Sequence, residues 1–174
     1  MPSEAWYAAL VGVVVLARLA ELVVARRHLQ WALARGGVEH GAGHYPVMVA
    51  LHTAFLVASL VEVPLADRPF LPWLGWPALA VLVAAHVLRW WCITSLGKRW
   101  TTRVVVLPGA PLVTRGPYRW LRHPNYVAVA MEIAALPLVH TAWVTAAVLT
   151  VLNAALLLGV RIPAEERALA GAAR

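Results

Sequence analysis

The stretch Gly116-Pro-Tyr-Arg-Trp-Leu-Arg-His-Pro-Asn-Tyr126 stands directly before a strongly apolar segment and indicates where that segment begins. Proline is favoured at the first position of a helix, where its missing N–H would have no partner anyway, so Pro124 is expected to open a helix. His123 and Asn125 would then lie where a membrane helix meets water, beside backbone N–H donors of the first turn. This stretch therefore predicts a binding site for a charged small molecule.

The composition indicates an integral membrane protein. Hydrophobic residues make up 61% of the 174 residues and charged residues only 13%, with a mean hydropathy of +0.71. A soluble domain is nearer half apolar and a quarter charged, and a chain this short cannot bury so much apolar surface in a core of its own. The net charge of +7 therefore does not require a nucleic-acid partner. The single cysteine, Cys92, excludes an internal disulfide and a thiol-rich metal site.

Five apolar segments predict membrane helices, at residues 6–24, 45–64, 74–96, 124–139 and 142–160. About 20 apolar residues are needed to cross the hydrocarbon layer, so the fourth segment is short for a full span. The tight link His140-Thr141 predicts that the fourth and fifth segments form an antiparallel helical hairpin, followed by a short helix over 161–174. We expect one all-α domain with about five transmembrane helices. Residues 1–96 would form a three-helix part, and residues 97–174 the connector, hairpin and C-terminal helix.

The connecting segments carry most of the positive charge. Residues 25–44 predict a short amphipathic helix and a flexible turn, and residues 97–122 predict irregular structure against the membrane face. Three lysines and arginines lie in residues 25–44, six in 97–122 and three in 161–174, which is twelve of the fifteen in the chain. Basic residues favour the cytoplasmic side. The distribution predicts a multi-pass protein of the cell membrane, with the N-terminus outside and the C-terminus in the cytoplasm. The binding site expected at His123 and Asn125 would then face the cytoplasm.

Several polar side chains lie within or beside the apolar segments. Arg18 and Glu21, three residues apart, share a helical face, and we interpret them as a structural salt bridge, although they could also line a cavity. Arg89 is expected to extend to the interface beside two tryptophans. His44 and His52 are interpreted as hydrogen-bonded structural residues, with contact to a substrate as the open alternative.

The predicted hairpin should bring distant chemistry together. Because the second helix returns beside the start of the first, Arg161 and Glu165 are expected close to His123 and Tyr126. Carboxylate, guanidinium, imidazole and phenol would then share one membrane interface and suit an amphoteric ligand, with its acid group on backbone N–H donors at the helix start. The sequence contains no Gly-x-Gly-x-x-Gly stretch, P-loop or His-Glu-x-x-His zinc motif, and no metal site is expected.

Three runs together resemble the isoprenylcysteine carboxyl methyltransferase family: Leu112-Val-Thr-Arg-Gly-Pro-Tyr118, Arg122-His-Pro-Asn-Tyr126, and Arg161 with Glu165-Glu166. The resemblance implies an S-adenosylmethionine pocket formed by the connector and the C-terminal hairpin. It implies that the acceptor oxygen faces Arg161. The cofactor contacts that it implies are Arg103, Ala110, Pro111, Leu112, Val113, Tyr118, His123, Pro124, Asn125, Tyr126 and Glu165.

The N-terminal half resembles a bacterial branch of these enzymes that is found alongside type III polyketide synthases. The runs that carry this resemblance are Arg18-Leu-Ala-Glu-Leu22, Arg26-Arg27, His44-Tyr-Pro and Leu51-His52. It implies O-methylation of alkylpyrones or alkylresorcinols, lipophilic acceptors that would enter from membrane lipid.

We therefore predict an integral membrane S-adenosylmethionine-dependent O-methyltransferase. Three alternatives stay open. Prenylcysteine carboxyl methylation would be the same chemistry on another acceptor. An NADPH-dependent membrane reductase is suggested because sterol reductases carry a stretch similar to Arg-His-Pro-Asn-Tyr. A membrane scaffold without enzymatic activity would bind no cofactor.

Overall fold

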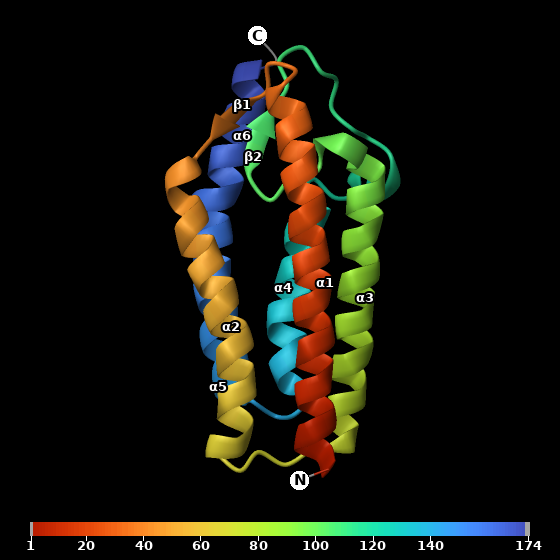
Figure 1. The fold of residues 1–174 in the computed structure, drawn as a ribbon, viewed down its shortest axis with the longest axis vertical. Helices are drawn as coiled ribbons and strands as arrows, with labels where there is room; N and C mark the ends of the chain where they lie inside the picture. Colours follow the sequence, from red (N-terminus) through yellow and green to blue (C-terminus); the bar gives the residue numbers. More distant parts are fainter. Residues whose placement is uncertain (1, 173–174) are drawn as a thin grey trace.

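The helices lie side by side along one long axis, as the computed structural model of the protein shows for residues 2–172 (Figure 1). The α-helices are α1 (Pro2–Leu33), α2 (Tyr45–Leu65), α3 (Pro72–Leu96), α4 (Pro124–Leu138), α5 (Trp143–Leu156) and α6 (Ile162–Ala172). Short 3-10 helices, η1 (Ala42–His44), η2 (Gly97–Arg99) and η3 (Gly116–Arg119), connect them. A π-helical turn, η4 (Leu157–Arg161), joins α5 to α6. The described ends of the chain lie at opposite ends of the bundle (Figure 1).

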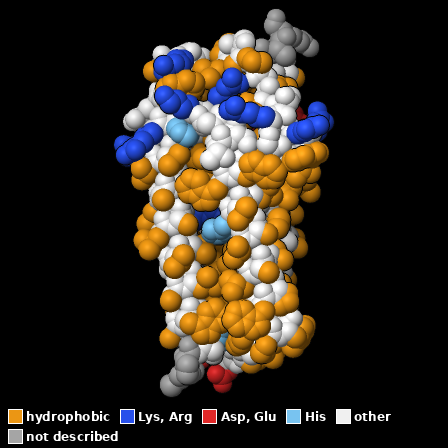
Figure 2. Space-filling view, turned by 90° about the vertical axis from the view of Figure 1, so that its right-hand side faces the viewer, with side chains coloured by type: hydrophobic (Ala, Val, Ile, Leu, Met, Phe, Trp, Pro, Cys, Tyr) orange, Lys and Arg blue, Asp and Glu red, His pale blue; other side chains and the backbone are white. Residues whose placement is uncertain are grey.

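Four helical stretches are long and apolar enough to cross a membrane: Ser3–Leu33, Ala42–Leu65, Pro72–Arg99 and Trp143–Gly171. The predicted fourth segment forms α4, but its 15 residues are too few for a full span, so the expected count of five is not confirmed. Hydrophobic side chains cover the sides of the bundle, and lysines and arginines gather at the end that carries β1, β2 and α6 (Figures 1 and 2). This separation suits a membrane protein whose sides face lipid and whose basic end lies in the water at the membrane surface.

The first helix is longer than predicted. A separate amphipathic helix within residues 25–44 was expected, but α1 continues unbroken to Leu33. No glycine or proline interrupts residues 13–35, and the helix ends only before Gly36, whose φ of 78° few other residues adopt. The basic residues of this region therefore extend the first membrane helix instead of forming a second one.

Two short strands close the basic end of the bundle, where irregular structure was predicted. β1 (Val38–His40) pairs antiparallel with β2 (Val104–Val106), and Val38 lies opposite Val106. Three consecutive valines favour a strand in β2, but the partner lies more than 60 residues away along the chain. The pair ties the end of α1 to the connector and so to the region of the expected site.

Candidate functional site

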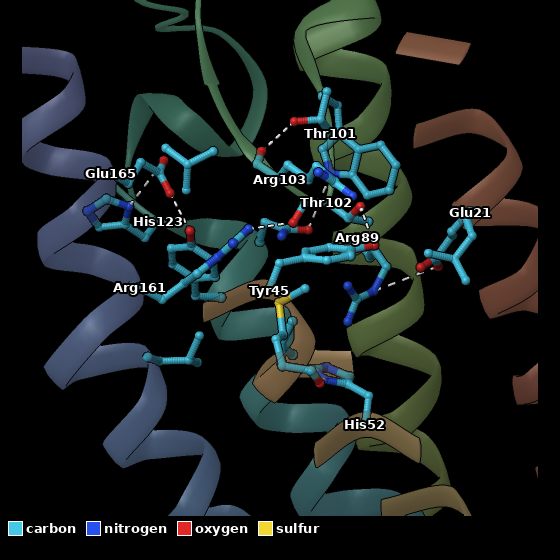
Figure 3. Close-up of a pocket in the computed structure, with 18 of the residues that line it drawn as sticks. Glu21, Tyr45, His52, Arg89, Thr101, Thr102, Arg103, His123, Arg161 and Glu165 are labelled. Carbon is cyan, nitrogen blue, oxygen red and sulfur yellow. Dashed lines mark hydrogen bonds and ion pairs between the residues drawn. The ribbon is translucent and has the colours of Figure 1, made fainter. Parts of the chain in front are cut away.

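A cavity of about 360 Å³ opens inside the bundle near its basic end. Side chains from α1, α2, α3, the connector, α4 and the segment after α5 line it (Figure 3). Among the predicted site residues, Arg103, Tyr118, His123, Asn125, Tyr126, Arg161, Glu165 and His52 all border this one cavity. Its wall mixes charged groups with apolar surface from α1 and α2.

Glu165 and the start of α4 form the acidic side of the cavity, as the hairpin geometry predicted. The Tyr126 hydroxyl donates a hydrogen bond to Glu165. The His123 ring stacks on Tyr126, with 5.6 Å between ring centroids, and its Nε2 lies 3.3 Å from Glu166 Oε1. The carboxylates of Glu165 and Glu166 favour the imidazolium and raise the pKa of His123 above its ordinary value.

The backbone at the start of α4 differs from the expectation. Free N–H donors were predicted there, but the N–H groups of Tyr126 and Val127 both donate to the carbonyl of His123. These two N–H groups are therefore already used, and the donors that remain for an acid group at this point include cationic side chains. The predicted site residue His123 lines the cavity. Arg122 also lines it, although the sequence had not led us to expect Arg122 in the site.

Arg161 lies at the end of the π-helical turn and is only 5% exposed. Its Nη1 donates to His44 Nε2 at 3.1 Å, and its Nη2 donates to the carbonyl oxygen of Thr102 at 2.5 Å. Its Nε is buried and has no hydrogen-bond partner among the described residues. Because Arg161 borders the cavity, it offers a preorganised cation to a bound anion (Figure 3).

The connector supplies further polar and aromatic side chains. Arg103 pairs with Glu39, with Nη1 at 2.9 and 3.2 Å from its two carboxylate oxygens, and its guanidinium lies over the Tyr45 ring. Tyr118 is partly buried, and desolvation raises the pKa of its hydroxyl, which keeps the phenol neutral. Asn125 accepts a hydrogen bond from the Trp100 indole at 3.5 Å.

Five of the predicted cofactor contacts lie elsewhere. Pro111, Leu112 and Val113 line a second, neighbouring hollow, and Arg99 and Leu96 border both hollows. Ala110 and Pro124 line neither hollow, and Pro124 is buried at the first position of α4. Pro111 is held in place by Arg99, whose Nη1 donates to the Pro111 carbonyl at 2.5 Å. Contacts from 110–113 to a cofactor remain a prediction from the resemblance.

A buried charge cluster, defined as Arg18, Glu21, Arg89 and Glu132, joins α1, α3 and α4. The predicted Arg18–Glu21 pair is confirmed, at 2.5 Å. Arg18 also pairs with Glu132, and Arg89 donates to Glu132 at 2.7 Å. The expectation that Arg89 reaches the interface is wrong, because Arg89 is 3% exposed and points inward. Glu132 was missed, although a carboxylate inside an apolar segment signals that a buried cation must face it.

The two candidate substrate histidines differ in position. His52 borders the cavity, and its Nδ1 donates to the Met48 carbonyl at 2.8 Å. His44 is not part of the cavity wall and instead contacts Arg161. The described residues hold no group of three or more histidines, cysteines, aspartates or glutamates that could bind a metal ion.

The sequence is similar to a known protein family and to two bacterial proteins. The model of the isoprenylcysteine carboxyl methyltransferase (ICMT) family matches residues 78–171, which include most of the cavity's charged residues. The uncharacterized protein YpbQ of Bacillus subtilis (strain 168) is 40% identical over 92% of this chain and 94% of its own length. An uncharacterized protein of Haemophilus influenzae (strain ATCC 51907 / DSM 11121 / KW20 / Rd) is 28% identical over 87% of this chain and 88% of its own. No solved structure matches the chain. With a match to more than half of its residues, the chain belongs to the isoprenylcysteine carboxyl methyltransferase family, a family of membrane methyltransferases.

Proposed function

We propose that the protein is an integral membrane O-methyltransferase that uses S-adenosylmethionine and methylates a lipophilic small molecule, such as an alkylpyrone or alkylresorcinol. One observation carries this proposal: a single cavity holds a buried arginine, Arg161, near a carboxylate, Glu165, and extends between apolar helices. The carboxylate side suits a cationic cofactor, and the arginine suits an anionic acceptor oxygen.

The residues on the acidic side fit the chemistry of S-adenosylmethionine. The Glu165 carboxylate would hold its ammonium group, and the cations of His123 and Arg122 would hold its carboxylate. Tyr118 and Tyr126 place neutral aromatic surface beside them. When bound, the cofactor supplies an electrophilic methyl group on a sulfonium.

Arg161 would bind the acceptor oxygen as its anion and orient it. A pyrone enol is largely ionised near neutral pH, so a strong base is not required for this class of acceptor. Alignment and the exclusion of water can lower much of the barrier to such a methyl transfer. The buried, prepositioned guanidinium of Arg161 would supply the alignment, and the cavity around it would exclude water.

The apolar walls support an acceptor with an alkyl tail. Leu19 and Leu22 of α1 and Val49 of α2 line the cavity and are also exposed on the outside of the bundle. We infer that the tail enters between α1 and α2 from lipid, while the cofactor enters from the cytoplasm at the basic end. The family match equally supports a prenylcysteine as the acceptor, and it favours methyl transfer over nicotinamide-dependent reduction.

Calorimetry in detergent tests the cofactor assignment. Wild-type protein should bind S-adenosylmethionine, and Glu165→Gln should lose most of that binding. Glu166→Gln is the matched control. Glu166 is the neighbouring carboxylate, but it is 48% exposed and does not line the cavity, so its loss should reduce binding far less than the loss of Glu165. Folded wild-type protein that binds no S-adenosylmethionine would contradict the proposal, and NADPH should then be tried.

Methyl transfer then identifies the acceptor class. Purified protein with labelled S-adenosylmethionine should be offered a 6-alkyl-4-hydroxy-2-pyrone, a 5-alkylresorcinol and a farnesylcysteine analogue in parallel. Transfer to the pyrone or resorcinol supports the proposed acceptors. Transfer to the farnesylcysteine analogue alone would replace them with a prenylcysteine.

A further inference from the structure

We propose that His44 is a positioning residue that holds the guanidinium of Arg161 through a neutral imidazole protonated on Nδ1. The inference concerns a residue outside the region 78–171 that matches the family. Its consequence for catalysis rests on the proposed role of Arg161 in binding the acceptor.

The hydrogen-bond chemistry fixes the state of the histidine. A guanidinium only donates hydrogen bonds, so His44 Nε2, at 3.1 Å from Arg161 Nη1, must present its lone pair. The proton of the neutral ring is then on Nδ1. A doubly protonated ring could not accept this bond and would place a second positive charge against Arg161.

Two acceptors on different nitrogens define the plane of the guanidinium. His44 receives Nη1, and the Thr102 carbonyl receives Nη2 at 2.5 Å. Arg161 borders the cavity whereas His44 does not, so the histidine supports the arginine from behind. The Nε of Arg161 has no hydrogen-bond partner among the described residues, so this donor is available to a ligand.

The backbone around His44 is built to place its ring there. Gly41 has a φ of 64°, and a Cβ at this position would lie 2.2 Å from His44 Cε1 and 2.8 Å from His44 Nδ1. Only glycine fits this conformation next to the ring. His44 follows strand β1 and Thr102 precedes strand β2, so the pairing of His40 with Val104 brings both acceptors to Arg161.

The tautomer can be measured without any ligand. Long-range ¹H–¹⁵N spectra of the histidine side chains in detergent micelles, at a pH where they are neutral, should show His44 with its proton on Nδ1; loss of one signal in His44→Gln assigns it. In Arg161→Met the His44 proton should move toward Nε2, the form that free imidazole side chains prefer. His52 is the internal control, because its Nδ1 donates to Met48 in both proteins.

A wild-type His44 with its proton on Nε2 would overturn the inference, and this result stands even if Arg161→Met does not fold. A folded Arg161→Met protein with an unchanged His44 tautomer would overturn it as well.

Steady-state kinetics with a 6-alkyl-4-hydroxy-2-pyrone measure the consequence. His44→Ala should raise the acceptor KM about tenfold, the effect of one lost hydrogen bond to a charged group, while calorimetry shows unchanged S-adenosylmethionine affinity. His44→Gln should recover most of the loss, because its amide oxygen can replace Nε2 as the acceptor.

An unchanged acceptor KM in His44→Ala would overturn the inference while leaving the methyltransferase proposal intact. Failure of the wild-type protein to bind S-adenosylmethionine would instead contradict the proposed function, and the tautomer measurement would still decide the geometry.

Discussion

Replacing Glu132 with glutamine should destabilise the folded bundle by about 3–5 kcal/mol. Glu132 is 1% exposed and accepts hydrogen bonds from Arg18 Nε at 3.0 Å and from Arg89 Nη2 at 2.7 Å. The buried charge cluster is neutral as it stands, with two arginines and two glutamates. Removing one carboxylate leaves two desolvated guanidinium groups facing the single carboxylate of Glu21.

The magnitude follows from the two ion pairs of Glu132. At an effective dielectric constant of about 20, a pair of charges at about 4 Å attracts by about 4 kcal/mol. Losing both pairs removes roughly twice that attraction. The variant also no longer carries the cost of desolvating the Glu132 carboxylate, several kcal/mol, and this offsets part of the loss. The remaining penalty of about 3–5 kcal/mol is that of a buried cation left without its partner.

Reversible unfolding in mixed micelles of rising SDS fraction, followed by circular dichroism, measures the change in unfolding free energy. The control is Glu166→Gln. The Glu166 carboxylate lies 3.9 Å from Arg122, whose side chain is 89% exposed. Losing this solvated ion pair should change the unfolding free energy by less than about 1 kcal/mol. If Glu132→Gln lowers the unfolding free energy no more than this control does, the conclusion is refuted that the four charges are desolvated and depend on one another. Apolar residues at all four positions should restore most of the stability, because the desolvation penalty disappears with the charges.

Two further changes are expected to alter stability. Glu62→Ala should lower the unfolding free energy by about 1–2 kcal/mol in the same assay. The reason is that the Glu62 carboxylate accepts hydrogen bonds from the backbone N–H groups of Thr145 at 2.7 Å and Val144 at 3.2 Å, in the first turn of α5. Glu62→Gln keeps one acceptor oxygen and should lose less stability. The carboxylate of Glu165 raises the pKa of His123, so the imidazolium stabilises the fold fully below about pH 6.5 and less as the pH rises through the raised pKa. Unfolding curves of His123→Gln should lack this decline in stability above about pH 6.5, and a wild-type stability that rises there would contradict the assignment.

The parts of the site that could be predicted from the sequence depend on neighbours along the chain. A proline after a histidine marks the start of α4, and the short link around His140-Thr141 returns α5 beside it. Those local facts suffice to place Glu165 against Tyr126, which the structure confirms. The pairing of Arg18 with Glu21 is equally local, because residues three apart share a helical face.

The parts that could not be predicted are contacts between distant segments. Arg89 reads as an interfacial arginine because two tryptophans follow it, and only the packing of α3 on α4 reveals that Glu132 draws it inward. The pairing of β1 with β2 leaves no local mark beyond three valines, since a strand is defined by its partner. Both contacts shape the cavity, so its depth was not foreseeable from the sequence.

The cavity draws on two regions of the chain that differ in their relation to the family. The side chains proposed for the cofactor, from Tyr118 to Glu165, fall within the matched residues 78–171. The α1 and α2 walls, His52 and the His44 support of Arg161 precede residue 78. In the proposed assignment these earlier residues contact or orient the acceptor and not the cofactor. It therefore predicts that differences in acceptor between family members arise mainly before residue 78. Substitutions there should then alter the acceptor KM and leave S-adenosylmethionine affinity unchanged, which is the separation expected for His44→Ala.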